Sequence, residues 1–351
     1  MRIIFGIIYH TLGGVASGSF YMPFNKVKGW SWETYWIIGG LFSWLIVPML
    51  VAYITIPGFM DIISAASSKI IFLTFLMGLM WGIGGLSYGL GVRYLGMSLG
   101  NTITLGFCAA FGAIIPSVYY SFHPVAGRVS FTDMLSTSGG LMVLGGVLVC
   151  LAGIAICGKA GMMKEKELSP EEQKKSIKEF NLVKGLVIAV LSGILSSFFN
   201  FGIETGTSMA DKAVELGHNP LFQNNVTFVV ILWGGLTTNF IWTAILTLKN
   251  KTYGDFVNTS TPIASNVLFS AMAGTTWFFQ FFFYGMGESK LGNGASSWIL
   301  HMSTIILTAN FWGIYRKEWS NVSTRTKRTI ITGILIMLIS VAIVGFGNTM
   351  L

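Results

Sequence analysis

The sequence predicts an all-α integral membrane protein of ten transmembrane helices, arranged as two inverted five-helix repeats. Three observations predict this fold. Hydrophobic residues make up 53% of the 351 residues and charged residues only 10%, whereas soluble domains are about 25% charged. The apolar residues form ten continuous runs, each of about the 20 residues needed to cross a bilayer. One hydrophilic stretch divides these runs into five and five.

The ten runs are each read as a membrane-spanning helix. A β-barrel would need short segments of alternating polarity, which these continuous runs are not. The first run lacks a basic leader and a small-residue cleavage site, so it is interpreted as a retained span and not a signal peptide. The expected spans are residues 3–24, 36–56, 70–90, 97–120, 139–157, 185–206, 223–248, 264–286, 296–315 and 329–348.

The hydrophilic stretch is residues 158–184, which we expect to be a cytoplasmic linker. Its charged run from Lys164 is typical of a solvated surface helix, and a plain linker is favoured over a regulatory site. The linker separates an N-terminal half, residues 1–157, from a C-terminal half, residues 185–351. Because each half has an odd number of spans, the halves must cross the membrane in opposite orientations. Inverted repeats of this kind are common in secondary transporters, which bind solute near the midplane between the repeats.

Charge asymmetry predicts the orientation in the membrane. Most of the 22 Lys and Arg residues lie in the odd-numbered loops between spans, such as Lys26 and Lys28 in the first and Arg316 and Lys317 in the ninth. Loops rich in Lys and Arg face the cytoplasm. The odd loops are therefore expected inside and both termini in the periplasm. The net charge of +8 then reflects orientation and does not indicate nucleic-acid binding.

The sequence predicts no catalytic residues, no metal site and no cofactor. Cys108, Cys150 and Cys157 lie in apolar runs without pairing or metal spacing, so they are interpreted as packing residues. No phosphate-binding loop and no His-Glu-x-x-His sequence is present. The chain is therefore not expected to be an enzyme.

A few polar residues inside the spans are candidates for proton coupling, because such residues are costly in a bilayer and usually functional. Glu204 is the first candidate, since a carboxyl group taken out of water is more easily protonated. Asn200 lies one turn earlier on the same helical face. The alternative is that Glu204 is exposed at a span end or paired with Lys212. His10 and His301 remain candidates because imidazole titrates near neutral pH, although either could instead form a structural hydrogen bond.

Aromatic clusters in the third and eighth spans suggest a sugar site. Aromatic faces and a few convergent polar groups line small-molecule sites, and lipid-facing aromatics with glycine packing are the competing interpretation. Trp30, Trp32, Tyr35 and Trp36 flank the second span and are expected to form an interfacial belt. The predicted substrate-binding residues are Trp81, Tyr88, Asn101, Asn200, Trp277, Gln280 and Tyr284.

Six stretches together form a pattern typical of one family. They are residues 21–34, from Tyr21 to Thr34, and residues 80–84, 93–98, 280–284, 297–302 and 317–319. These stretches resemble the bacterial L-rhamnose–proton symporters, and residues 21–34 resemble the first loop of that family. The resemblance runs nearly end to end. It implies the drug/metabolite transporter superfamily, ten spans in two inverted halves, and uptake of L-rhamnose or a related deoxyhexose with a proton across the inner membrane.

The chain departs from the family pattern at Asn101, where we expect a small residue, near Glu204, where we expect an amide, and around Glu288. These departures leave the exact sugar and the proton site open. The rival functions are an exporter or an antiporter of another substrate, and a non-transporting sensor or scaffold. An anion antiporter should carry Lys or Arg inside its spans, and a sensor should carry a soluble domain. The expected partners are a sugar, a proton and the lipid bilayer; no oligomeric state is predicted.

Overall fold

The computed structural model describes residues 2–122, 124, 129–169, 171–172, 180–291, 294–348 and 350. This part of the chain is helical and contains no strand. The larger helices are α1 (Arg2–Ser19), α3 (Trp32–Leu41), α4 (Val47–Thr55), α6 (Ser68–Phe122), α8 (Ser138–Glu167), α10 (Leu182–Ser196), α11 (Phe198–Thr205), α12 (Thr207–Glu215), α13 (Asn224–Asn250), α14 (Ile263–Leu291), α15 (Gly294–Tyr315) and α16 (Thr324–Asn348). The short elements are α2 (Tyr21–Phe24), the π-helix η1 (Phe42–Ile46), α5 (Phe59–Ala65), α7 (Phe131–Ser136), and the 3-10 helices η2 (Pro220–Phe222) and η3 (Thr252–Phe256).

Within the described residues, 8 helical stretches are long and apolar enough to cross a membrane. They coincide with the predicted spans other than the first and the ninth, so the all-helical membrane architecture is confirmed at this level. The two remaining predicted spans are also helical, as α1 with 18 residues and α15 with 22; their crossing stays a prediction. The stretches are Trp32–Thr55, Ser68–Gly96, Leu99–Phe122, Ser138–Glu167, Leu182–Glu215, Pro220–Asn250, Ile263–Leu291 and Thr324–Gly347.

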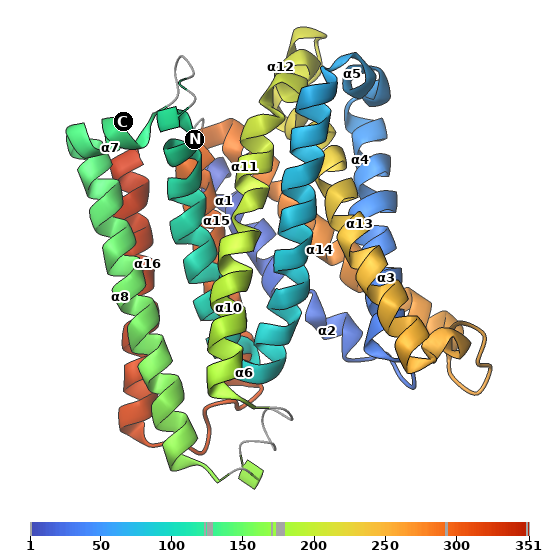
Figure 1. Ribbon diagram of the computed structural model, residues 1–351, viewed down its shortest axis with the longest axis vertical. Helices are drawn as coiled ribbons and strands as arrows, with labels where there is room; N and C mark the ends of the chain where they lie inside the picture. The colour runs from blue at the N-terminus through green and yellow to red at the C-terminus, as the bar shows by residue number, and fades with distance from the viewer. Residues whose placement is uncertain are drawn as a thin grey trace.

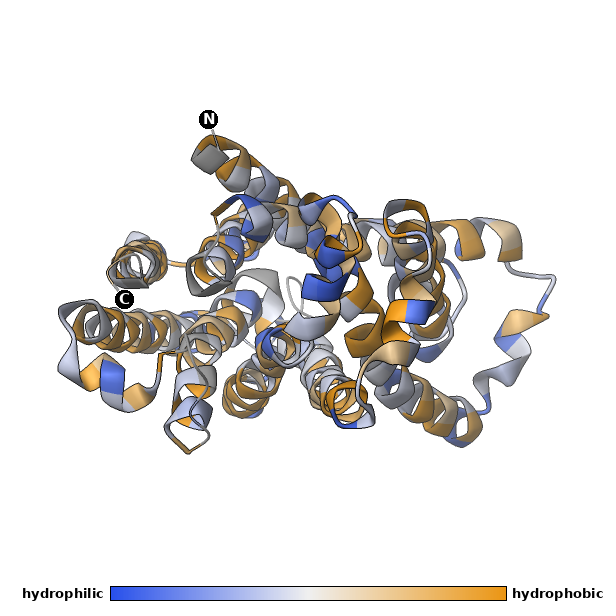
Figure 2. Ribbon diagram, turned by 90° about the horizontal axis from the view of Figure 1, so that it is seen from above, coloured by the Kyte–Doolittle hydropathy of each residue, from blue (hydrophilic) through white to orange (hydrophobic). Residues whose placement is uncertain are grey.

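The long helices lie side by side, with both chain termini at one end (Figure 1). We call this the upper end, and the opposite end, where α8 meets the linker, the lower end. Hydrophobic residues dominate the helices when the molecule is seen from above (Figure 2). Large apolar side chains remain exposed on the outside, including Leu148 (68%), Val183 (72%) and Leu248 (73%). An apolar exterior of this kind fits contact with lipid hydrocarbon.

Helix α6 joins the third and fourth predicted spans without a loop. Its helical geometry is interrupted at Gly96, which has φ 84° and ψ 170°. Glycine adopts this conformation at no steric cost because it has no Cβ. The chain reverses direction there, so the limb Ser68–Gly96 runs down and the limb Leu99–Phe122 runs back up beside it (Figure 1). Arg93, predicted in a loop, lies instead in the helix just before this reversal.

Glycines allow α8 and α16 to approach closely along their length. A Cβ built on Gly153 would lie 3.0 Å from the Gly333 carbonyl oxygen, and one on Gly333 would lie 3.0 Å from the Gly153 oxygen. Gly139 and Gly347 face each other in the same way, at 2.8 and 2.9 Å. Small residues at helix contacts are the usual means of close packing in membranes. The fifth and tenth predicted spans thus form one tightly packed pair at the side of the molecule.

The predicted interfacial belt is wrong for Trp36 and Trp30, which are buried. Trp36 is only 3% exposed, and its indole N–H donates to Asn239 Oδ1 at 2.9 Å. Trp30 is 9% exposed. Trp36 is buried because α3 packs against both α13 and α14. Trp30, which precedes α3, lies against Phe256 of η3.

The solvated helix predicted from Lys164 is also wrong for that residue. Helix α8 continues to Glu167, and Lys164 is 1% exposed. Its ammonium group donates to the Glu318 carbonyl oxygen at 2.7 Å and lies 4.8 Å from the centre of the Trp319 ring. Glu167 accepts hydrogen bonds from Ser323. Residues 173–179 of the predicted linker lie outside the described residues.

The family-like stretch 21–34 binds the end of α13, the 3-10 helix η3 and the start of α14. Asn266 accepts from the Lys28 backbone N–H at 3.0 Å and donates to the Lys28 carbonyl at 2.8 Å. Glu33, which is buried, accepts from Asn250 at 3.0 Å and from Thr252 at 2.8 Å. These contacts connect the two predicted halves at the lower end and give this stretch a structural role.

Candidate functional site

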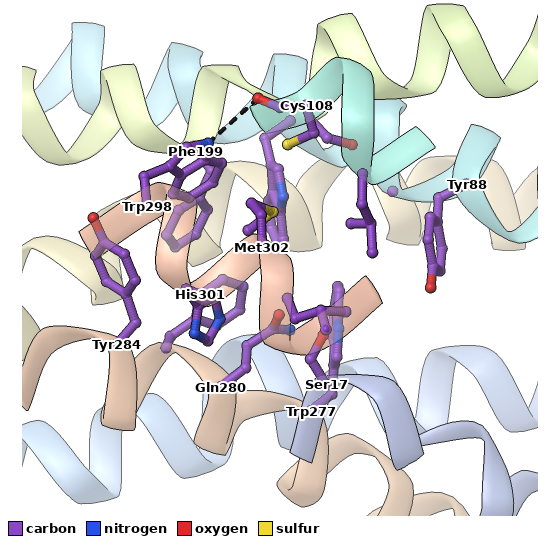
Figure 3. Close-up of a pocket in the computed structure, with 16 residues that line it drawn as sticks. Ser17, Tyr88, Cys108, Phe199, Trp277, Gln280, Tyr284, Trp298, His301 and Met302 are labelled. Carbon is purple, nitrogen blue, oxygen red and sulfur yellow. Dashed lines mark hydrogen bonds between the residues drawn. The ribbon is translucent and has the colours of Figure 1, made fainter. Parts of the chain in front are cut away.

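A cavity of about 60 Å³ lies in the middle of the helices (Figure 3). Its walls come from both predicted halves: α1, both limbs of α6, the segment from α10 to α11, α14 and α15. Most of the wall is aromatic or aliphatic, with a few polar side chains. The lining residues are Ser17, Trp81, Gly85, Tyr88, Leu105, Cys108, Ser196, Phe199, Trp277, Gln280, Phe281, Tyr284, Trp298, His301, Met302 and Ile305.

The structure brings together most of the predicted substrate-binding residues in this cavity. Trp81 and Tyr88 reach it from the first limb of α6, and Trp277, Gln280 and Tyr284 reach it from α14. These residues are far apart in the sequence, and only the packing of α6 against the C-terminal half makes them neighbours. The prediction from aromatic clusters therefore selected residues that do share one cavity.

Two predicted residues, Asn101 and Asn200, do not line the cavity. Asn101 is buried and its side-chain oxygen accepts a hydrogen bond from the Tyr88 hydroxyl. Asn200 donates from Nδ2 to the Gly112 carbonyl oxygen at 3.1 Å. Each amide is engaged by protein, so Asn101 orients a cavity residue while Asn200 connects α11 to the second limb of α6.

Trp81 and Trp277 stack on each other across the junction of the two predicted halves. Their ring centroids are 5.6 Å apart and their planes differ by 16°. Phe281 meets the edge of the Trp81 ring at 5.6 Å, and Trp44, from the π-helix η1, meets Trp277 at 5.5 Å. Aromatic pairs of this geometry are favoured by the quadrupoles of their rings. The cavity thus has a rigid aromatic wall.

Each of these tryptophans follows, one turn later, a glycine that contacts the backbone of another helix. A Cβ on Gly78 would overlap the Ile231 carbonyl of α13, and a Cβ on Gly274 would overlap the Gly39 carbonyl of α3. Sequence reasoning missed both glycines. The signal was available as a Gly-x-x-Trp pattern that occurs once in the third span and once in the eighth.

Polar groups enter the cavity mainly from Gln280 and His301. Gln280 is 5% exposed, and its Nε2 has no hydrogen-bond partner within the described part of the chain. The ring nitrogens of His301, which is 2% exposed, make no hydrogen bond of normal geometry there either. Both side chains point into the pocket in Figure 3. A buried polar atom without a partner is costly, so these groups fit a polar ligand in the cavity.

His10 lies behind His301 and Tyr284, outside the cavity lining. The three rings contact one another, with centroid distances of 5.8 Å for His10–His301 and 5.4 Å for each pair that includes Tyr284. Glycines make room for both imidazoles: a Cβ on Gly287 would lie 2.6 Å from His10, and one on Gly13 would lie 2.7 Å from His301. The two predicted histidines are thus neighbours.

The chain is similar to one family of known proteins along almost its whole length. Residues 1–350 match the family model for L-rhamnose-proton symport protein (RhaT). The chain belongs to this family. It is similar to proteins named L-rhamnose-proton symporter from Yersinia pestis (strain Pestoides F) and Yersinia pseudotuberculosis (strain YPIII), at 39% identity over 350 residues, with 98% of each chain covered. The protein of that name from Mannheimia succiniciproducens is 37% identical over 350 residues, again with 98% of both chains covered. These relatives are named as transporters, not enzymes.

Glu204 lies in a second cavity of the protein. The second cavity is about 300 Å³ and is lined by Leu73, Met77, Tyr119, Tyr120, Phe201, Glu204 and Thr205. Glu204 is half-buried and accepts a hydrogen bond from the Tyr120 hydroxyl at 3.4 Å. Lys212, the alternative partner considered for Glu204, instead pairs with Glu215 at 3.0 Å. The structure therefore separates Glu204 from Gln280 and His301.

Sequence reasoning missed other residues that shape these sites. Trp298 lines the central cavity and donates to the Cys108 carbonyl oxygen at 3.3 Å (Figure 3). Glu288, noted only as a departure from the family pattern, accepts from Asn224 Nδ2 at 2.7 Å one turn above Tyr284. Single residues in apolar runs carry no periodic signal that separates a cavity wall from a helix contact. Within the described residues, no cluster of His, Cys, Asp and Glu has the arrangement of a metal site.

Proposed function

We propose that the protein carries L-rhamnose, or a related deoxyhexose, into the cell together with a proton. The observation that carries the proposal is the central cavity, where the Trp81 and Trp277 indoles lie beside the Gln280 amide and the His301 imidazole. The apolar face of a sugar ring packs on aromatic side chains, and an amide can both donate to and accept from hydroxyl groups. The names of the relatives agree with this substrate.

His301 is the proton-coupling group that the geometry favours, with His10 behind it. A proton site and a sugar site in one cavity can change each other's affinity directly, and such coupling is reciprocal. An imidazole ring can also accept and release a proton at a ring nitrogen. Glu204, the first candidate from the sequence, lies in the neighbouring cavity and does not line the cavity that holds Gln280.

The energetics of such coupling are sufficient. One proton that moves down a membrane potential of about 100 mV supplies about 2.3 kcal/mol. This free energy supports a concentration ratio of roughly 50 for the sugar. A single coupled proton per sugar therefore allows useful accumulation.

The ten-span inverted-repeat architecture, and with it the drug/metabolite transporter superfamily, is part of the proposal. Reciprocal contacts support it: α1 packs on α14 and α15, as α10 packs on the two limbs of α6, and α3 packs on α14 as α13 packs on α6. If each span of the N-terminal half is equivalent to the span five positions later, each pair of contacts is one contact that occurs once in each half. Helix α1 begins at the upper end and is followed by α2 at the lower end (Figure 1), which supports α1 as a span.

The proposed location is the inner membrane, with the termini in the periplasm. The connections from α2 to α3, from α13 to α14 and from α15 to α16 lie at the lower end, whereas both termini lie at the upper end (Figure 1). These connections carry Lys26, Lys28, Lys251 and Lys317, and Lys249 lies in the last turn of α13. Because cytoplasmic loops are enriched in Lys and Arg, the lower end is assigned to the cytoplasm.

Uptake of labelled L-rhamnose into cells that lack their own transporter tests the function, with the pH of a weakly buffered medium recorded at the same time. We expect uptake together with a transient alkaline shift, because protons leave the medium with the sugar. Gln280→Ala should weaken sugar binding by about 1–3 kcal/mol, or roughly 5- to 150-fold, since a buried partner is lost.

Phe279→Ala is the matched control, because Phe279 precedes Gln280 on α14 but is 37% exposed and outside the cavity. Uptake without any pH change would contradict proton symport. Efflux of preloaded sugar without uptake would instead indicate the alternative function, an exporter.

A further inference from the structure

The second cavity, which contains Glu204, is larger than the central one and has its own polar and aromatic wall. Its volume is about 300 Å³, against about 60 Å³ for the central cavity. It is built at the upper end, between the start of α6, the end of α6 and α11. A hollow of this size falls within the range of small-molecule sites.

The wall of this second cavity has the chemistry that recognises a neutral polyol. The Glu204 carboxylate accepts hydrogen bonds, and the Tyr120 hydroxyl can donate. The Thr205 hydroxyl donates to the Phe201 carbonyl at 2.6 Å, which leaves its oxygen as an acceptor. Tyr119 and Phe201 supply ring faces and contact each other edge to face at 5.0 Å.

The two cavities lie one above the other along the same two helices. On α6, Met77 lines the second cavity and Trp81 lines the central one; on α11, Glu204 lines the second and Phe199 the central one. Met77 and Trp81 are four residues apart, or about 6 Å along a helix. One helical turn therefore separates the two cavities.

Asn200 and Phe199 form the partition between them. Phe199 is fully buried, and it stacks on Phe281 with ring centroids 4.3 Å apart. Asn200 donates to the Gly112 carbonyl and so ties α11 to the second limb of α6. Passage of a sugar from one cavity to the other would require this partition to move.

We propose that the second cavity is an outer sugar-binding site, which holds the sugar before it enters the central cavity, with Glu204 accepting hydrogen bonds from sugar hydroxyl groups. This inference rests on the proposed function, because it takes the transported deoxyhexose as the ligand. It gives Glu204 a substrate contact and leaves the proton to the histidines of the central cavity.

Equilibrium binding of labelled L-rhamnose to purified protein in lipid nanodiscs tests the proposal by counting sites. The wild type should bind two sugars per chain. Glu204→Leu should weaken one site at least tenfold and leave the affinity of the other unchanged, whereas Gln280→Ala should weaken only the other site. Glu204→Gln should keep two sites, with the outer one weakened only a few-fold, because its amide oxygen still accepts hydrogen bonds.

The unchanged central site in Glu204→Leu serves as the internal control for folding, and Glu215→Gln on α12 is the matched surface control, because Glu215 is exposed. A single site in the wild type that Glu204→Leu leaves intact would overturn the inference while the proposed function stands. So would two sites in the wild type of which Glu204→Leu weakens neither. No L-rhamnose binding at either site would refute the proposed function itself.

Discussion

Gly274→Ala should destabilise the fold, because the added methyl group would overlap the Gly39 carbonyl of α3. Overpacking costs about 1–3 kcal/mol, and the upper part of this range applies because the obstacle is backbone and not a flexible side chain. Alanine regains about 1 kcal/mol as a better helix former. The net loss is therefore about 2 kcal/mol. Gly78→Ala, against the Ile231 carbonyl, should cost about the same.

Gly145→Ala provides the control, since Gly145 lies in α8 with nothing within 4 Å of its added Cβ. This variant should gain up to about 1 kcal/mol from helix propensity alone. Reversible unfolding in mixed micelles of increasing sodium dodecyl sulfate measures both variants, and their free energies should differ by about 2–3 kcal/mol. Equal stability of Gly274→Ala and Gly145→Ala would refute the close contact between α3 and α14. Sugar binding should weaken in Gly274→Ala as well, because Trp277 lies one turn further along α14.

Three other predictions follow from the same structure. Asn239→Leu should cost about 1–3 kcal/mol, because it leaves the buried Trp36 indole N–H without an acceptor; adding Trp36→Phe should recover part of the loss in the same unfolding assay. His301→Gln should bind L-rhamnose and exchange it across the membrane of vesicles, but it should fail to accumulate the sugar against a gradient. Glu204→Gln should still accumulate it. The reverse outcome would assign the proton to Glu204. A cysteine at position 172 should resist a membrane-impermeant thiol reagent in intact cells and react after lysis; labelling in intact cells would invert the proposed orientation.

Sequence alone located the helices well because the bilayer imposes a length and an apolar character on every span. The observed helix ends differ most from the predicted span ends where a helix continues beyond its apolar run. Helix α8 continues past residue 157 to Glu167, and hydropathy cannot tell a charged helical turn from a loop. Lys164 is an example. Its ammonium group lies against Trp319, which is distant in the sequence, so local hydropathy does not reveal its burial.

The sequence predicted some residues of the candidate site and missed others, and the difference has a physical reason. Polar and aromatic residues in apolar runs must face protein or a cavity, and that rule selected Gln280 and Trp277. It cannot separate a residue that faces the cavity from one that faces a neighbouring carbonyl, which is where Asn200 lies. The rule also fails for Trp36, because the local sequence around a tryptophan near a span end looks the same whether the side chain lies at the membrane interface or packs inside the protein.

The repeated Gly-x-x-Trp pattern connects the fold to the proposed transport. Each glycine brings its helix against the backbone of a helix from the other predicted half, and each following tryptophan reaches the shared stack of Trp81 on Trp277. Because the two indoles come from different predicted halves, any movement of one half against the other must shear this stack. A sugar bound at the proposed central site would contact both rings, so its binding energy would depend on how the two predicted halves are placed. Differential affinity of this kind is what allows a ligand to shift a conformational equilibrium, and the proposed site would place the substrate contact where the two predicted halves meet.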